Sequence, residues 1–177
     1  ISLNDELIGP RFRLAQIAHK HDRTEKAIAF LKQELEFDIT DSDVLLSMGK
    51  LFMAIEDYDF ASHCFLKVAD LDAQDYQPFY YLGLSMAKAD QLTDSLHFLD
   101  YALDLDPDCA DVLLQKALIH FQLKAYNDAK LTASQVLEIS PDNPQAKKIL
   151  KRIKFAKLIH KINLNIERIT SKLPFKT

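Results

Sequence analysis

The strongest constraint on this chain is an internal repeat with a period of 34 residues. Four segments of that length follow one another without a gap, at residues 8–41, 42–75, 76–109 and 110–143. Their eighth and twentieth positions are small: Ala15, Gly49, Gly83 and Ala117, then Ala27, Ala61, Ser95 and Ala129. A fixed period of this length is typical of arrays in which one supersecondary unit stacks on the next.

The composition indicates that each unit is helical. The chain has only 3 glycines and 6 prolines in 177 residues, too few for the turns of a strand-rich fold. Pro107 and Pro141 fall where a second helix would just have ended, so they interrupt nothing. Small residues at the eighth and twentieth positions let two antiparallel helices approach closely. We therefore expect an all-α chain of four helix-turn-helix repeats.

The third segment identifies the repeat family. It carries a large aromatic, a Leu-Gly pair, small residues and a final proline at set places: Phe79, Leu82, Gly83, Met86, Ser95, Leu99, Ala102 and Pro107. This pattern resembles the tetratricopeptide repeat. The resemblance covers residues 8–143 and implies an α-α superhelix, with residues 1–177 as a single domain. Arg11, Glu34, Lys116 and His120 depart from the pattern in the first and last repeats, and we interpret them as end effects.

Residues 144–173 read as one long basic amphipathic helix that begins at Pro144. Residues 1–143 carry 12 Lys and Arg against 25 Asp and Glu, a charge of −13, whereas residues 144–177 carry 10 against 1, a charge of +9. We interpret the helix mainly as the cap of the last repeat. Phe155, Leu158 and Leu164 widen its apolar surface, so its outer half also suits a homo-oligomer or a larger assembly.

The resemblance implies a binding surface as well. In this family the first helix of each repeat lines a concave face, with positions 2, 5, 9 and 12 inward and 6 and 13 beside them. The candidate partner-binding residues are Phe12, Arg13, Gln16, Leu46, Lys50, Met53, Tyr80, Tyr81, Leu84, Leu114, Gln115, Leu118 and Phe121. This set predicts a groove for a peptide or partner segment with apolar anchors. The alternative is that its aromatic members serve internal packing.

These features predict a protein-protein interaction module, an adaptor, scaffold or chaperone. Chaperone-binding relatives clamp a C-terminal carboxylate with Lys, Arg and Asn, but the equivalent places here hold Phe12, Gln16, Ser47, Gln77 and Tyr81. That argues against an Hsp70 or Hsp90 tail as the ligand. Two alternatives stay open: a structural subunit assembled through the solenoid ends and the basic helix, and a non-catalytic repeat domain of a longer enzyme.

Motifs for catalysis or cofactor binding are not seen, so we expect no enzyme activity, cofactor or metal. The sequence has no GxxxxGK[ST], GxGxxG or GxSxG motif. Cys109 stands where a calcium loop starting at Asp104 would need glycine. The acidic repeats would repel phosphate, which ranks nucleic acid and anionic membranes below protein partners. We expect a cytoplasmic protein, although the chain opens at Ile1 and a preceding segment is conceivable.

Overall fold

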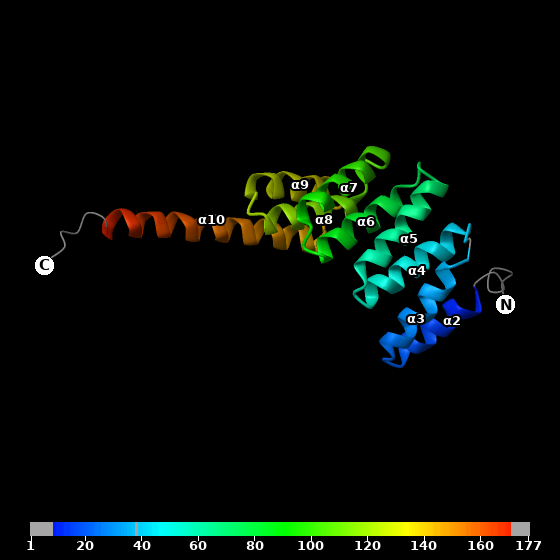
Figure 1. The fold of residues 1–177 in the computed structure, drawn as a ribbon. Helices are drawn as coiled ribbons and strands as arrows, with labels where there is room; N and C mark the ends of the chain where they lie inside the picture. Colours follow the sequence, from blue (N-terminus) through cyan, green and yellow to red (C-terminus); the bar gives the residue numbers. More distant parts are fainter. Residues whose placement is uncertain (1–8, 38, 171–177) are drawn as a thin grey trace, which may run out of the picture. The chain divides into compact units, whose positions relative to one another are not determined.

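In a computed structural model of the chain, the described residues are 9–37 and 39–170, with side chains described as far as Arg168. These residues form helices joined by short turns, and no strand occurs among them (Figure 1). This confirms the all-α prediction. The helices are α2 Pro10–Lys20, α3 Thr24–Leu35, α4 Ser42–Ala54, α5 Tyr58–Leu71, α6 Tyr76–Lys88, α7 Leu92–Leu105, α8 Ala110–Gln122, α9 Tyr126–Ile139 and α10 Pro144–Thr170.

Each predicted repeat segment contains one antiparallel pair of helices. Within each pair, the small residues at the eighth and twentieth positions are buried where the helices approach. At Gly83 of α6, an added Cβ would lie 2.8 Å from Cγ of Leu99 in α7, closer than carbon atoms pack. The glycine is required here because the two helices touch, which is the reason the repeat pattern has a small residue at this place.

The turn inside each pair uses a left-handed residue. Asp22, Glu56, Asp90 and Lys124 have φ angles of 56°, 64°, 62° and 60°. These four residues are spaced 34 apart, so the turn repeats with the same period as the helices. None of the four is glycine, the residue that adopts this conformation most cheaply.

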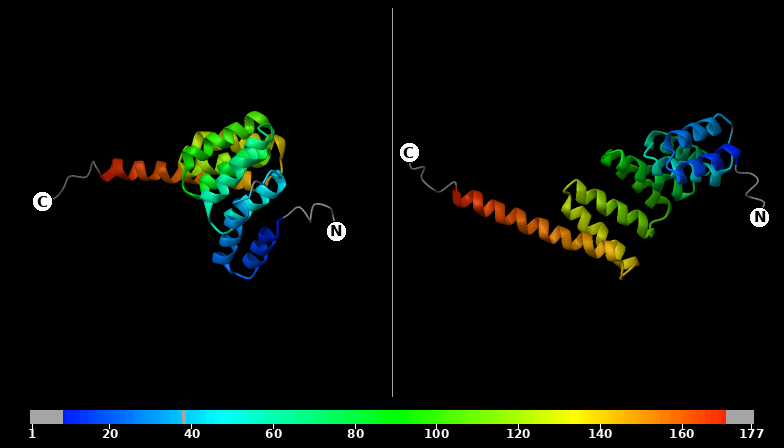
Figure 2. Two further views of the ribbon diagram at one scale, coloured as in Figure 1. Left: turned by 45° about the vertical axis from the view of Figure 1, so that its right-hand side comes forward. Right: turned by 90° about the horizontal axis from the view of Figure 1, so that it is seen from below.

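By its contacts the chain divides into two compact units, residues 1–107 and 108–177, which we describe in turn. In the first unit, the pairs α2–α3, α4–α5 and α6–α7 follow one another (Figure 2). Its core cluster is apolar and continuous from α2 to α6. The largest members are Phe12, Leu31, Met48, Phe52, Phe65 and Leu82.

Aspartates begin several of these helices. Asp41 accepts hydrogen bonds from the backbone N–H groups of Asp43 and Val44 at 2.9 and 3.1 Å, at the start of α4. Asp75 does the same for α6, accepting from the N–H of Gln77 at 2.9 Å. Such caps satisfy N–H groups that have no partner within the helix, and they explain why the helices start where they do.

The departures in the first repeat have a packing explanation. The guanidinium of Arg11 lies 4.9 Å from the ring centroid of Phe37, a cation-π contact. Glu34 is buried, 7% exposed, and its carboxylate fills the space beside Gly9. Both residues therefore belong to the packing of this first pair.

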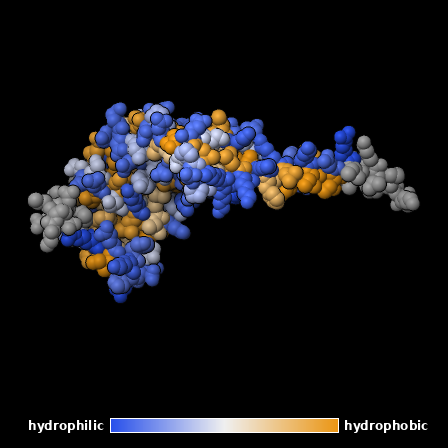
Figure 3. Space-filling view, turned by 180° about the vertical axis from the view of Figure 1, so that it is seen from behind, coloured by the Kyte–Doolittle hydropathy of each residue, from blue (hydrophilic) through white to orange (hydrophobic). Residues whose placement is uncertain are grey.

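The second unit consists of the antiparallel pair α8–α9 and the long helix α10. Asn143 caps α10, accepting hydrogen bonds from the N–H groups of Gln145 and Ala146 at 3.0 Å each. The first half of α10 packs on α8 and α9, and its second half runs past them with apolar side chains on its surface (Figures 1 and 3). The predicted helix extended to residue 173, and its last three residues lie outside the described part of the chain.

Among the described residues, no helix combines the length and the apolar character needed to cross a membrane.

Candidate partner-binding surfaces

The predicted binding residues of α2 differ widely in exposure. Phe12 is 1% exposed and belongs to the core of the first unit, whereas Arg13 and Gln16 are exposed. A partner would therefore reach the two polar side chains but very little of the aromatic one. A residue's position in the repeat predicts the face toward which its side chain points. It does not predict how deeply that side chain is buried.

The predicted residues of α4 and α6 are more accessible and partly come together. Leu46, Met53, Tyr80, Tyr81 and Leu84 are half-buried. Tyr81 stacks on Phe65 with ring centroids 5.3 Å apart, and the ring centroids of Tyr80 and Tyr81 are 5.2 Å apart. The exposed Lys50 of α4 places its Nζ 4.5 Å from the centroid of the Tyr81 ring. This contact joins two predicted residues from different helices into one aromatic surface that carries a positive charge.

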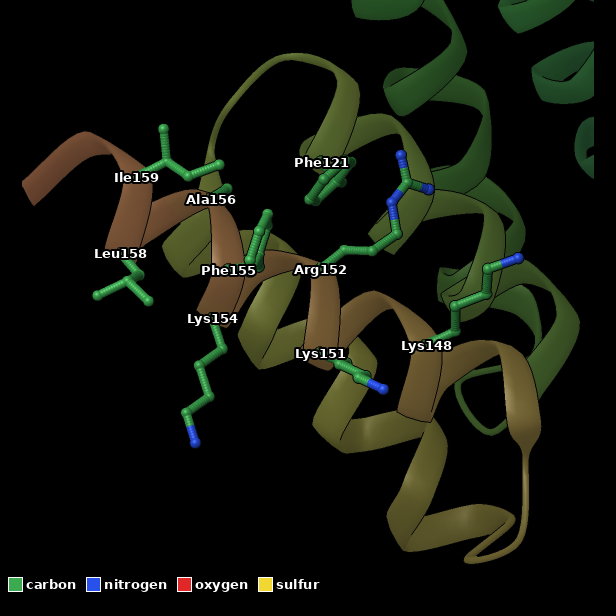
Figure 4. Close-up of a pocket in the computed structure, with 9 residues that line it drawn as sticks. All are labelled: Phe121, Lys148, Lys151, Arg152, Lys154, Phe155, Ala156, Leu158 and Ile159. Carbon is green, nitrogen blue, oxygen red and sulfur yellow. The ribbon is translucent and has the colours of Figure 1, made fainter. Parts of the chain in front are cut away.

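In the second unit, the predicted residues of α8 lead to a hollow beside α10. Leu114 is 5% exposed and so is largely inaccessible, while Gln115, Leu118 and Phe121 are half-buried. Phe121 forms one wall of a hollow of about 790 Å³ (Figure 4). The other lining residues all come from α10. They are Lys148, Lys151, Arg152, Lys154, Phe155, Ala156, Leu158 and Ile159.

The centre of this hollow combines aromatic rings with cations. The Arg152 guanidinium lies 4.4 Å from the centroid of the Phe121 ring, and Figure 4 shows Phe155 beside them. The ring of Tyr126, at the start of α9, supports Phe121 from a centroid distance of 5.7 Å. Among the described residues, Lys148, Lys151 and Lys154 make no hydrogen bond or ion pair. Their ammonium groups are therefore available to an anionic partner.

α10 is held firmly enough to form this wall. Ala146, Ile149 and Ile153 are 0%, 2% and 3% exposed and anchor its first half on α8 and α9. Farther along, the Nζ of Lys157 donates a hydrogen bond of 2.8 Å to Oδ1 of Asn127 in the first turn of α9. On this helix, Arg152 and Phe155 lie beside Phe121 (Figure 4).

Sequence reasoning found Phe121 but did not assign the α10 residues to the site. The signal was present, because counting a fifth repeat from Pro144 puts Lys148, Arg152 and Phe155 at positions 5, 9 and 12. These are the inward positions that the prediction applied only to the four complete repeats. The structure places these residues beside Phe121, at position 12 of the fourth repeat. In this respect α10 behaves as the first helix of another repeat.

Residues 9–37 and 39–168 contain no cluster of three or more His, Cys, Asp or Glu side chains that is placed to hold a metal ion. The arrangement instead offers contact area, aromatic rings and positive charge. Those are features of surfaces that bind another molecule.

Comparison with known proteins agrees with this arrangement. A family model described as the tetratricopeptide repeat matches residues 86–153, which include α8, α9 and the start of α10. Residues 86–153 therefore contain tetratricopeptide repeats. The crystal structure of MamA superposes with a TM-score of 0.69 at 20% identity, covering 90% of this repeat protein and 97% of that chain.

Two further similarities cover less of the chain. The first TPR of Spaghetti (RPAP3), bound to the HSP90 peptide SRMEEVD, has a TM-score of 0.64 at 21% identity, covering 68% of our chain and 96% of that one. The UDP-N-acetylglucosamine–peptide N-acetylglucosaminyltransferase of Giardia intestinalis is 30% identical over 81 residues. That match covers 46% of our chain and only 6% of the transferase.

Proposed function

We propose that this chain is a binding module that holds an acidic, apolar-anchored segment of a partner protein in the hollow between α8 and α10. The fold itself supports a protein-protein interaction module. The observation that carries the finer proposal is the pairing of Phe121 and Phe155 with Lys148 and Arg152 in one hollow. Apolar anchors would fill the space between the rings, and carboxylates would meet the cations.

The energetics favour such a ligand. Aromatic side chains supply large contact area at a low cost in conformational entropy, and they dominate binding energy at the centres of interfaces. Arg152 stays charged and is already positioned over Phe121, so a carboxylate gains a pre-oriented donor. The chain has no acidic residue between Pro144 and Ile166, so nothing on this stretch of α10 competes for the cations from within the helix.

The surface of α4 and α6 is the second part of the proposal. Lys50 over the Tyr81 ring repeats, in the first unit, the combination of a cation and an aromatic ring seen in the second. We propose that the accessible residues predicted there, Leu46, Met53, Tyr80 and Leu84, contribute further apolar contacts. The carboxylate-clamp positions lack the expected Lys, Arg and Asn, so we propose a partner other than an Hsp70 or Hsp90 tail.

Two other roles follow from particular observations. The match to a glycosyltransferase over 81 residues is compatible with a repeat domain of a longer enzyme, in which the hollow would engage the enzyme's protein substrate. The exposed outer half of α10 is compatible with a structural subunit. In both cases binding, rather than catalysis, is the role proposed for these residues.

The test is a selection of ligands from a random peptide library on the intact chain, followed by affinity measurements on the selected peptides. We expect them to share one or two large apolar residues next to Asp or Glu. The affinity should fall at least about tenfold in Phe121→Ala and in Arg152→Glu, since each removes a central contact. It should also weaken as salt concentration rises, because exposed charge pairs are screened.

Lys130→Glu is the matched control for the charge change, because Lys130 is exposed on α9 and does not line the hollow. It should leave the affinity within about twofold of the parent chain. Circular dichroism of each variant checks that helicity is intact. Peptides without acidic residues, or equal loss in the Lys130→Glu control, would contradict the proposal.

A further inference from the structure

The outer half of α10 presents an apolar surface that its own unit does not cover. Every described side chain from Lys157 to Arg168 is exposed. Three isoleucines among them, Ile159, Ile162 and Ile166, are 44%, 48% and 52% exposed. Figure 3 shows apolar side chains gathered on this projecting part of the helix. Large exposed apolar patches of this kind mark interaction sites.

The spacing of these residues is that of a coiled-coil seam. Phe155, Ile159, Ile162 and Ile166 are separated by 4, 3 and 4 residues, the alternation of a and d positions in a heptad. The same spacing continues in the sequence to Ile169 and Leu173, whose side chains lie outside the described residues. A seam of this period on one helix requires a second helix to cover it.

This seam differs from the stripe that holds α10 on its own unit. The inner stripe consists of Ala146, Ile149, Ile153 and Ala156 and faces α8 and α9. Leu164 continues the inner stripe by its spacing and lies on the opposite side of the helix from Ile162 and Ile166. α10 therefore has two apolar stripes, and only the inner one is covered within the unit.

The distribution of charge indicates what covers the seam. Between Phe155 and Ile166 the positions that flank it, e and g of the heptad, hold Ala156, Leu158, Asn163 and Asn165, all uncharged. The lysines of the same stretch, at 157 and 161, fall on the far side. In a helix this basic, a seam free of flanking charge lets two identical helices meet without opposing like charges. An acidic partner helix would instead be expected to meet basic residues at e and g.

We infer that a second copy of this chain docks on the outer half of α10, seam against seam, through Ile159, Ile162 and Ile166. Phe155 and Ile159 line the hollow as well as the seam, whereas Ile162 and Ile166 belong to the seam alone, so substitutions at these two residues test the pairing separately from peptide binding. The seam described here spans about two heptads, shorter than the three or four of a sustained coiled coil. The self-association is accordingly weak and depends on concentration.

Sedimentation velocity of the intact chain, from about 1 μM to 1 mM, measures this association. The average mass rises with concentration. Ile162→Glu, and separately Ile166→Glu, raises the dissociation constant at least about tenfold, because each copy then places an unpaired carboxylate in the apolar seam. Both side chains are exposed, so helicity measured by circular dichroism stays at the level of the parent chain.

Leu164→Glu is the matched control, since Leu164 is 51% exposed on the same helix and receives the same charge, yet lies off the seam. It leaves the dissociation constant within about twofold of the parent value. The inference is overturned if the chain stays monomeric over the whole concentration range. It is equally overturned if Leu164→Glu weakens the association as much as Ile162→Glu does.

Discussion

The close approach of α6 and α7 at Gly83 permits a sharp test of the repeat packing. Replacing Gly83 by alanine adds one methyl group, whose carbon would stand 2.8 Å from both Cγ and Cδ2 of Leu99 and 3.2 Å from the carbonyl oxygen of Ser95. Leu99 is fully buried, so its side chain has little room to move. The carbonyl of Gly83 also accepts a 2.6 Å hydrogen bond from the Ser95 hydroxyl, which ties the helices together at this point.

Two opposing effects determine how much Gly83→Ala changes the free energy of unfolding. Alanine favours a helix over glycine by about 1 kcal/mol, which would stabilise the chain. Overpacking a close-packed core costs about 1–3 kcal/mol, and the two Leu99 carbons make this cost unavoidable. We expect Gly83→Ala to lower the free energy of unfolding by up to about 2 kcal/mol.

The effect of Gly83→Ala on the free energy of unfolding should change sign when Leu99 is replaced by alanine. Leu99→Ala alone costs about 2–5 kcal/mol by leaving a cavity, but it removes both atoms that oppose the new methyl group. In that background Gly83→Ala should stabilise the chain by about 0.5–1 kcal/mol, partly offset by the contact with the Ser95 carbonyl. Urea unfolding of the two single variants and the double variant, followed by circular dichroism, gives the coupling. If Gly83→Ala raised stability in the parent chain, the close approach of α6 and α7 would be wrong.

Further predictions concern turns, caps and ionisation. Lys124→Gly should raise the free energy of unfolding by up to about 1 kcal/mol, because Lys124 has a φ of 60°, which glycine adopts without a steric cost. Urea unfolding measures this change, and a lower free energy of unfolding in the variant would contradict the left-handed turn. Asp75→Ala should cost about 1 kcal/mol by removing the cap on the N–H of Gln77, whereas Asp75→Asn should retain most of the stability. Burial raises the pKa of the Cys64 thiol from 9.0 to about 12, and the charge of Lys67 opposes this rise. As pH rises, the Cys64 thiol ionises in the unfolded chain before it ionises in the folded chain. Stability should therefore be unaffected by this thiol below pH 9 and should fall as pH rises from 9 toward 12. A Cys64→Ala variant should lack that part of the decline.

The helices were predictable because their packing depends on residue size. Gly49 and Gly83 occupy places where a Cβ would overlap the Phe65 or Leu99 side chain, so the repeat admits only small residues there. A pattern set by steric exclusion is visible in the sequence. The left-handed turns were not predicted, since Glu56 and Lys124 carry no signal for a positive φ. Their conformation follows from the helices that they connect.

The binding surface was only partly predictable, for two physical reasons. The inward direction of a position does not determine exposure, and Phe12 and Leu114 are buried because neighbouring side chains cover them. The predicted repeats also ended at residue 143, because the sequence from Pro144 reads as one long helix, and α10 is a single helix over the described residues 144–170. Lys148 and Arg152 occupy inward positions of α10. They line the hollow because α10 packs on α8 and α9 as the first helix of a fifth repeat would.

The length of α10 supports a role beyond capping. The helices α2 to α9 have 11 to 14 residues, whereas α10 has 27, about 40 Å of helix. The buried side chains of α10 end before Lys157, since every described side chain from Lys157 onward is exposed. A projecting helix receives little packing energy from its own unit, and isolated segments of this length are marginal in water. Exposed isoleucines on such a segment are favourable only once another surface covers them. Because the flanks of their seam are uncharged, a second α10 would cover them without repulsion between like charges.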